Sequence, residues 1–255
     1  MMNKSKYYTD DELIRRVWDI EDIRNMMGRR AFYAANELRR EELLDFWVTA
    51  PEYRNTASFG SNWGYYIGMD AVSNYYVVKH DKDRKAHLES LAAFDPSVEY
   101  KDENLGLGCM SIHPVSTPLV ELAGDGKTAQ GLWYTFGQET VSRPDGTALA
   151  NWIYHRTAAD FVKENGQWRI WHMLVIYDFS NEAGTDVSEL PVFYEPGANP
   201  LEQEFGNPTI PMLTHDSTYN WWDGYPREPS PYYTFSPEMG YGPEGHPDNK
   251  DRRMM

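Results

Sequence analysis

His113 is the residue whose type and surroundings best suit acid–base chemistry. It lies in the segment Met110-Ser-Ile-His113-Pro, directly before a stretch that alternates like a strand. An imidazole titrates near neutral pH, so one side chain can take a proton from carbon and return it to a leaving oxygen. A second histidine, His155, shares one face of a later predicted strand with Asn151, Ile153 and Thr157. We expect catalysis by His113, while His155 either contacts a ligand or makes a structural hydrogen bond.

Other chemistries lack their motifs. His80 and His87 are seven residues apart on a predicted helix, which is too far for one metal ion without a third ligand. The motifs HExxH, Walker A and GxSxG and the glycine-rich dinucleotide loop are all absent. We therefore expect no metal, no cofactor and no covalent nucleophile.

The elements that must position these residues change character along the chain. Thr9-Asp-Asp-Glu12 resembles a capping box ahead of a helical periodicity, and further helices are predicted at 41–47 and 69–91. From residue 110 onward the period is two, and turns such as Gly124-Asp-Gly and Glu164-Asn-Gly separate long strands. Helices followed by a meander predict an α+β fold in which an antiparallel sheet curls around the helices.

A change in composition near Ser180 divides the chain. We expect a compact domain over residues 1–179 and a proline- and glycine-rich arm over 180–255. The arm carries aromatic clusters, which disordered segments lack, so we expect residues 185–240 to pack on this subunit or a neighbouring one. Trp221, Trp222 and Tyr225 are the expected anchors, in a lid over the site or in a structural belt.

Charge and composition exclude several functions. Acidic residues outnumber basic ones 39 to 24, for a net charge of −15, which disfavours nucleic acid or an anionic membrane as partner. The single cysteine excludes an internal disulfide framework. The sequence has no apolar run of transmembrane length and no apolar stretch typical of a signal peptide near its start, so we expect a cytoplasmic protein.

Five short segments, taken in order, resemble the SnoaL-like branch of the nuclear transport factor 2-like superfamily. They are Asp19-Ile-Glu-Asp-Ile-Arg with Glu41-Glu-Leu-Leu, then Thr117-Pro-Leu-Val-Glu-Leu with Gly131-Leu-Trp-Tyr, and finally Asn165-Gly-Gln-Trp-Arg-Ile. The resemblance covers about residues 10–179 and implies a cone, in which a curved antiparallel sheet wraps around helices. Members include scytalone dehydratase, bile acid 7α-dehydratase, ketosteroid isomerase, a diarylpropane lyase and many proteins that are not enzymes. It also implies a homo-oligomer, a trimer or a dimer.

The resemblance also implies roles for single residues. His113 stands where the dehydratases carry their acid–base histidine, but Asn36 stands where their first helix has an aspartate. Tyr33, one helical turn earlier, is either a hydrogen-bond donor to substrate or a core aromatic. Gly137 replaces an acid or a histidine and should leave space for a ring, while Glu139 is either the replacement acid or a solvated strand end.

Residues on the inward faces of the strands should line the cone. Tyr65 or Tyr66 is an alternative to Phe59 as the tyrosine of the dehydratases. The predicted substrate-binding residues are Trp133, Thr135, Thr157, Trp171, Met173, Tyr177, Phe59 and Trp63.

These residues suggest a lyase without a cofactor, which removes water or cleaves a carbon–carbon bond in a bulky hydroxylated aromatic or polycyclic molecule. Two alternatives remain open. A ketosteroid-type isomerase would need an inward carboxylate base in an apolar site. A non-catalytic small-molecule-binding protein would need no titratable pair at all.

Overall fold

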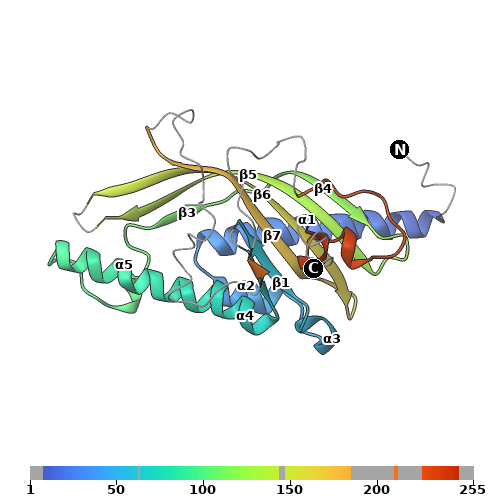
Figure 1. Ribbon diagram of the computed structural model, residues 1–255, viewed down its shortest axis with the longest axis horizontal. Coiled ribbons are helices and arrows are strands. Elements are labelled where there is room, and N and C mark those ends of the chain that lie inside the picture. The colour runs from blue at the N-terminus through green and yellow to red at the C-terminus, as the bar shows by residue number, and fades with distance from the viewer. Residues whose placement is uncertain (1–7, 63, 144–146, 185–209, 212–225, 247–255) are drawn as a thin grey trace.

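The fold follows from a computed structural model, which describes residues 8–62, 64–143, 147–184, 210–211 and 226–246. A curved sheet covers one side of a helical layer (Figure 1). The predicted anchors Trp221, Trp222 and Tyr225, and Trp63, lie outside the described residues. None of the helices in the described ranges has the length and apolarity needed to cross a membrane.

The helical layer begins with α1, which starts where the sequence predicts. Thr9 caps it: the Thr9 hydroxyl accepts from the Glu12 amide, and the Glu12 carboxylate accepts from the Thr9 amide, so the predicted capping box is confirmed. Glu37 follows the helix end with a φ of 58°, in a left-handed conformation that usually favours glycine. The helices are α1 (Asp10–Ala35), α2 (Arg39–Phe46), α3 (Pro51–Arg54), α4 (Met69–Ser73), a π-helical segment (Asn74–Lys79) and α5 (His80–Phe94).

The sheet is mixed, whereas the sequence predicts an antiparallel one. β1 runs parallel to β7, and the other strand pairs are antiparallel. A parallel pair needs a long crossover, and here more than a hundred residues separate the two strands. The order is β3-β5-β6-β7-β1-β2-β8, and β4 also pairs with β5. The strands are β1 (Ser58–Ser61), β2 (Gly64–Ile67), β3 (Met110–Ile112), β4 (Ser116–Leu122), β5 (Thr128–Ser142), β6 (Ala148–Glu164), β7 (Gln167–Glu182) and β8 (Ile210–Pro211).

The two faces of the sheet have separate apolar clusters. The inner cluster joins the helices to the concave face and contains Met27, Trp47, Trp133 and Phe161. The outer cluster contains Leu174 and Tyr241, among others, and Tyr241 comes from the C-terminal part of the chain. We call residues 226–246 the C-terminal belt, because they pack against the outer face.

Two irregularities in the β6–β7 pairing bend the sheet and change which residues face inward. In the backbone register between the two strands, one irregularity leaves Asp178 with no residue opposite it, and the other leaves Trp171 with none. Such bulges increase the local twist and redirect side chains. As a result, Ile170 and Met173, three residues apart, both lie in the inner cluster.

Candidate active site

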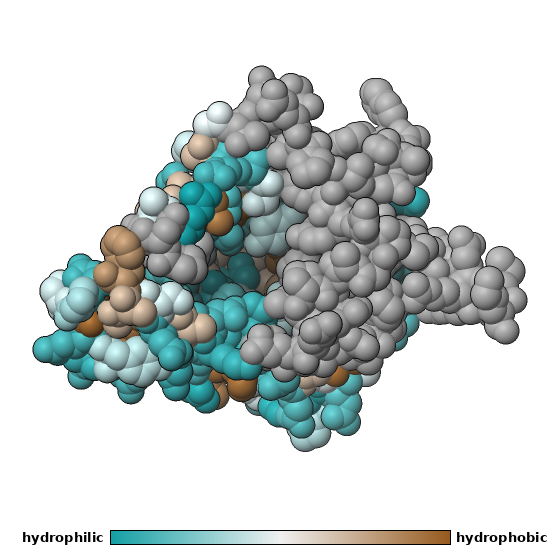
Figure 2. Space-filling view, turned by 60° about the vertical axis from the view of Figure 1, so that its left-hand side comes forward, coloured by the Kyte–Doolittle hydropathy of each residue, from teal (hydrophilic) through white to brown (hydrophobic). Residues whose placement is uncertain are grey.

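A cavity of about 410 Å³ lies between the end of α1, the α5 region and the concave face of the sheet. Figure 2 shows a hollow in the surface whose visible walls are largely hydrophilic. Aromatic rings of Phe59, Tyr75 and Tyr177 form part of the lining. The cavity therefore combines flat apolar surfaces with many charged side chains.

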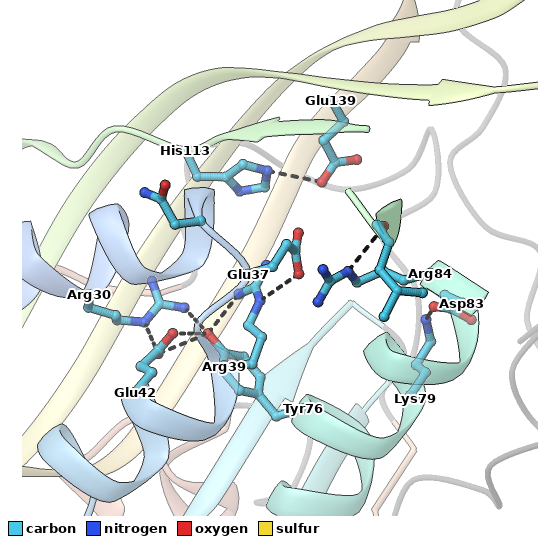
Figure 3. Close-up of polar contacts among 12 residues, drawn as sticks. Arg30, Glu37, Arg39, Glu42, Tyr76, Lys79, Asp83, Arg84, His113 and Glu139 are labelled. Carbon is cyan, nitrogen blue, oxygen red and sulfur yellow. Dashed lines mark hydrogen bonds and ion pairs between the residues drawn. The ribbon is translucent and has the colours of Figure 1, made fainter. Parts of the chain in front are cut away.

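Four side chains form a continuous polar chain at one wall of this cavity. The Thr157 Oγ1 lies 3.3 Å from His155 Nδ1, and His155 Nε2 lies 3.2 Å from His113 Nδ1. On the other side of the ring, His113 Nε2 is 2.9 Å from Glu139 Oε1 (Figure 3). This last contact is an ion-pair contact and not a well-aligned hydrogen bond. His113 is thus connected at both ring nitrogens, to a buried base and to a carboxylate.

The two histidines differ in their surroundings. His155 is 3% exposed, and its burial, followed by the nearby His113 and Arg30, lowers its pKa well below the usual value. His155 therefore stays neutral and can only accept or donate hydrogen bonds. His113 and Glu139 are more accessible, at 17% and 36% of their side-chain surface. Proton exchange with a ligand is therefore open to the His113–Glu139 end of the chain.

The strands explain this arrangement. β3 pairs with β5 so that Ser111 is opposite Glu139, which places His113, two residues later, beside that carboxylate. His155 is opposite Thr135 on β5 and Tyr177 on β7. The bulge at Tyr154 and His155 keeps His155 on the inner face while Arg156 pairs with Asp178.

A buried ionic network lies beside the histidines. Glu42 is fully buried, and its Oε1 lies 2.9 Å from Arg30 Nε. The Tyr76 hydroxyl donates to Glu42 and accepts from Arg30 at 2.7 Å and from Arg39 at 3.1 Å (Figure 3). Burial raises the Tyr76 pKa against the opposing charges of Arg30 and Arg39, and the Glu42 carboxylate adds to the rise, so the phenol keeps the proton that this network uses. The network holds two guanidinium groups at the cavity wall.

His80 is another cavity histidine whose pKa is strongly lowered. Burial and then the charges of Arg39, Lys79, Arg84 and His113 lower its pKa to about 3. It directly follows the π-helical segment, a type of helix that is frequent at functional sites. At neutral pH His80 is therefore an uncharged donor and acceptor in the wall.

The structure brings together some of the predicted site residues. His113, His155, Phe59 and Tyr177 line the same cavity. Thr157 is buried directly behind His155, to which it bonds. Thr135 is also fully buried opposite His155, and its hydroxyl finds no partner among the described residues. Their roles in binding or catalysis stay predictions.

Other predicted residues do not reach the cavity. Tyr33 donates to Asp45 at 3.0 Å and packs against Phe46, and Asn36 caps α1 by donating to the Phe32 carbonyl. Neither residue belongs to the lining of the cavity. Trp133 and Met173 belong to the inner core.

Two further expectations need correction. The bulge at Trp171 removes it from the inner alternation, and its ring packs against Tyr53 and His172. Gly137 does not leave space for a ligand ring, because a Cβ there would lie 2.2 Å from the Ile112 carbonyl oxygen of β3. That space is filled by backbone.

Sequence analysis missed the charged half of the cavity. His80, Arg84 and His87 line it from α5, and their spacing of four and three residues places them on one helix face. That spacing is present in the sequence, but histidines and arginines at helical intervals do not by themselves indicate a cavity wall. Glu37 also lines the cavity, and no local sequence signal identifies its left-handed backbone. Within the described ranges, no three His, Cys, Asp or Glu residues are placed to hold a metal ion.

Comparisons with known proteins agree with this fold. The family model described as a SnoaL-like domain matches residues 15–174. A search of curated proteins found no match.

Solved structures with similar folds are only distantly related in sequence. A putative scytalone dehydratase from Novosphingobium aromaticivorans has 11% identity and a TM-score of 0.45, covering 67% of this chain and 91% of its own. Hexachlorocyclohexane dehydrochlorinase LinA-type3 from Novosphingobium barchaimii has 11% identity and a TM-score of 0.44, covering 68% and 95%. An NTF2-like protein with a cystatin-like fold from Novosphingobium aromaticivorans has 14% identity and a TM-score of 0.43, covering 72% and 94%. Function does not transfer at such distances. The family match spans more than half of the sequence, and the chain belongs to the SnoaL-like family.

Proposed function

We propose that this protein is a lyase that works without a cofactor on a bulky hydroxylated aromatic or polycyclic small molecule, with His113 as the acid–base group. The supporting observation is the chain Thr157–His155–His113–Glu139 at the wall of one cavity. It couples an accessible imidazole to a carboxylate on one side and to a neutral histidine on the other. This is the arrangement that proton transfer to and from a substrate requires.

The proton balance of an elimination fits this chain. In the reactive state, with Glu139 turned aside from His113 Nε2, His113 Nδ1–H donates to His155 Nε2 and His155 Nδ1–H donates to Thr157, which leaves His113 Nε2 as the base. Glu139, with the more exposed side chain, turns aside as substrate binds. His113 Nε2 takes the proton from carbon, the electron pair forms the double bond, and the same proton leaves with the departing hydroxyl as water. The Glu139 carboxylate stabilises the intermediate imidazolium and takes the place of the missing first-helix aspartate.

Carbon–carbon cleavage that releases an aldehyde would start differently, with His113 taking the proton of a hydroxyl. An electron-accepting ring would then hold the electron pair of the broken bond. The aromatic walls suit both versions. The ketosteroid-isomerase alternative fits less well, because Arg30, Arg39, Lys79 and Arg84 line the cavity and its surroundings are not apolar.

The test is turnover of a panel of hydroxylated aromatic and steroidal compounds, followed by mass spectrometry. His113→Ala should reduce turnover by at least about 100-fold. Glu139→Gln should also reduce it, whereas Glu89→Gln on the exposed side of α5 should not. Turnover should survive exhaustive chelation. Unchanged turnover by a folded His113→Ala protein would overturn the proposal, and ligand binding without turnover would favour the non-catalytic binder.

Three earlier expectations remain proposals. We propose a homo-oligomer, to be checked by light scattering, and a cytoplasmic location, to be checked by fractionation. The division at residue 179 also stays a prediction, and β7 continues three residues beyond it, to Glu182.

A further inference from the structure

We propose that Arg84 binds a carboxylate group of the molecule that occupies the cavity, so that the ligand class is an aromatic acid. This inference rests on the proposed function for the identity of the cavity as the substrate site. It adds a charge to the ligand and assigns the residue that recognises it.

Charge pairing in the cavity singles out Arg84. Arg30 pairs with Glu42 at 2.9 Å, Arg39 lies 3.7 Å from Glu37, and Lys79 pairs with Asp83. Arg84 has one polar contact among the described residues, from its Nε to the Leu105 carbonyl at 3.4 Å. No carboxylate in those ranges forms an ion pair with it. Among the wall cations just named, the Arg84 guanidinium is therefore the one that no carboxylate of the described residues pairs with.

The position of Arg84 favours a ligand and not bulk water as its partner. It is partly buried and shares its helix face with His80 and His87. The Leu105 carbonyl holds Nε, which leaves both terminal nitrogens available. Figure 3 shows the side chain extending from α5 toward the side where Glu37 lies. The positive surroundings of this wall also appear in the low pKa of His80, to which burial contributes most and Arg39, Lys79 and Arg84 contribute next.

Chemistry and size define the ligand. A guanidinium offers parallel N–H donors that match the two oxygens of a carboxylate. Phe59 and Tyr75, stacked at 5.4 Å, and Tyr177 supply flat surfaces in the same cavity. A bicyclic aromatic acid fits within about 410 Å³.

Glu37 lines the same cavity, and changing it should have the opposite effect on acid binding to changing Arg84. Its Oε2 is buried without a hydrogen-bond partner among the described residues, on a backbone with φ of 58°. A ligand carboxylate at Arg84 would be repelled by this charge. Neutralising Glu37 should therefore strengthen the binding of an acid, whereas neutralising Arg84 should weaken it.

The experiment measures the binding of 2-naphthoate and of the uncharged 2-naphthamide by calorimetry. Arg84→Gln should weaken naphthoate binding by about tenfold or more and change naphthamide binding less than about twofold. Arg84→Lys should lose part of the affinity, and Glu37→Gln should gain some. The matched control is Lys85→Gln, an exposed cation on the same helix, which should change neither.

Failure of wild-type protein to bind naphthoate would overturn the proposal, as would equal affinity of Arg84→Gln or an equal loss for both probes. The proposed lyase function has its own readout, which is turnover. His113→Ala should abolish turnover and keep the preference for binding naphthoate over naphthamide. Turnover that depends on His113 without a charge preference would sink only the inference about Arg84.

Discussion

His113 illustrates at the residue scale how neighbours convert an ordinary side chain into a candidate catalyst. His155 behind it is held neutral by burial, so the proton that His113 gains cannot pass inward as charge. Glu139 in front of it is accessible, and its carboxylate favours the imidazolium once formed. The asymmetry directs proton exchange toward the cavity.

The second cavity histidine, His80, should make stability depend on pH. Its pKa is about 3 in the folded protein and near 6.5 when unfolded, so the unfolded chain gains a proton that the folded one does not. Stability from this group is present above pH 6.5 and falls as the pH drops toward 3, by up to about 1.4 kcal/mol per pH unit. We expect the free energy of unfolding of His80→Gln, measured by urea denaturation, to fall less steeply with decreasing pH than that of the wild type between about pH 6.5 and 3. Parallel curves for the variant and the wild type would contradict the assignment.

At the scale of elements, the close contact between β3 and β5 sets the position of His113. A methyl group at Gly137 would meet the Ile112 carbonyl, which is backbone and cannot move alone. Gly137→Ala should therefore displace β3, cost about 1–3 kcal/mol of stability and lower activity in the folded fraction. Gly28→Ala in α1 is the control, since nothing lies within 4 Å of the added group and alanine favours the helix. Equal melting temperatures of Gly137→Ala and the wild type would refute this view of β3.

The belt is held to the outer face by a buried polar cluster. Asp160 accepts from Gln130 at 2.9 Å, from the Tyr241 amide at 2.6 Å and from His172 at 2.8 Å. The other ring nitrogen, His172 Nε2, lies 3.1 Å from the Thr56 carbonyl oxygen.

Loss of the carboxylate should release the belt. Asp160→Asn should cost about 3 kcal/mol and increase hydrogen exchange at Tyr241. The exposed Asp102→Asn is the control. Unchanged exchange in Asp160→Asn would show that the belt is held by other contacts.

The elements also show what sequence could and could not predict. Periodicity and turn residues predicted the first helix with its cap and the long strands of the meander. Strict alternation failed at Trp171, because a bulge adds one residue and no local signal places it. The partners of His113 required the pairing of β3 with β5 and of β5 with β6, which are contacts distant in sequence.

At the scale of the whole molecule, the C-terminal belt lies on the opposite face of the sheet from the cavity. Backbone bonds join the amides of Gly124 and Asp125 to the carbonyls of Tyr232 and Tyr233, and Tyr65 donates to the Tyr241 carbonyl. These contacts belong to the outer face, while the cavity opens on the inner one. For residues 226–246 the contacts fit a structural belt. The lid expected as the alternative for residues 185–240 stays a prediction, because 185–209 and 212–225 lie outside the described residues.

Truncation separates these two parts of the arm. A chain ending at Tyr225 lacks the belt and leaves Asp160 and His172 without their cover, but it keeps residues 185–225 and the whole of β7. A cut after Ser180 would instead remove Asn181 and Glu182, which pair with β6. We expect the chain ending at Tyr225 to melt at least about 5 °C lower than the full chain and to bind more of a dye that detects exposed apolar surface. Below its melting transition it should bind 2-naphthoate with unchanged affinity, because the cavity walls come from the inner face. An unchanged melting temperature would show that the belt is dispensable, and a loss of naphthoate affinity in the folded protein would connect the outer face to the site.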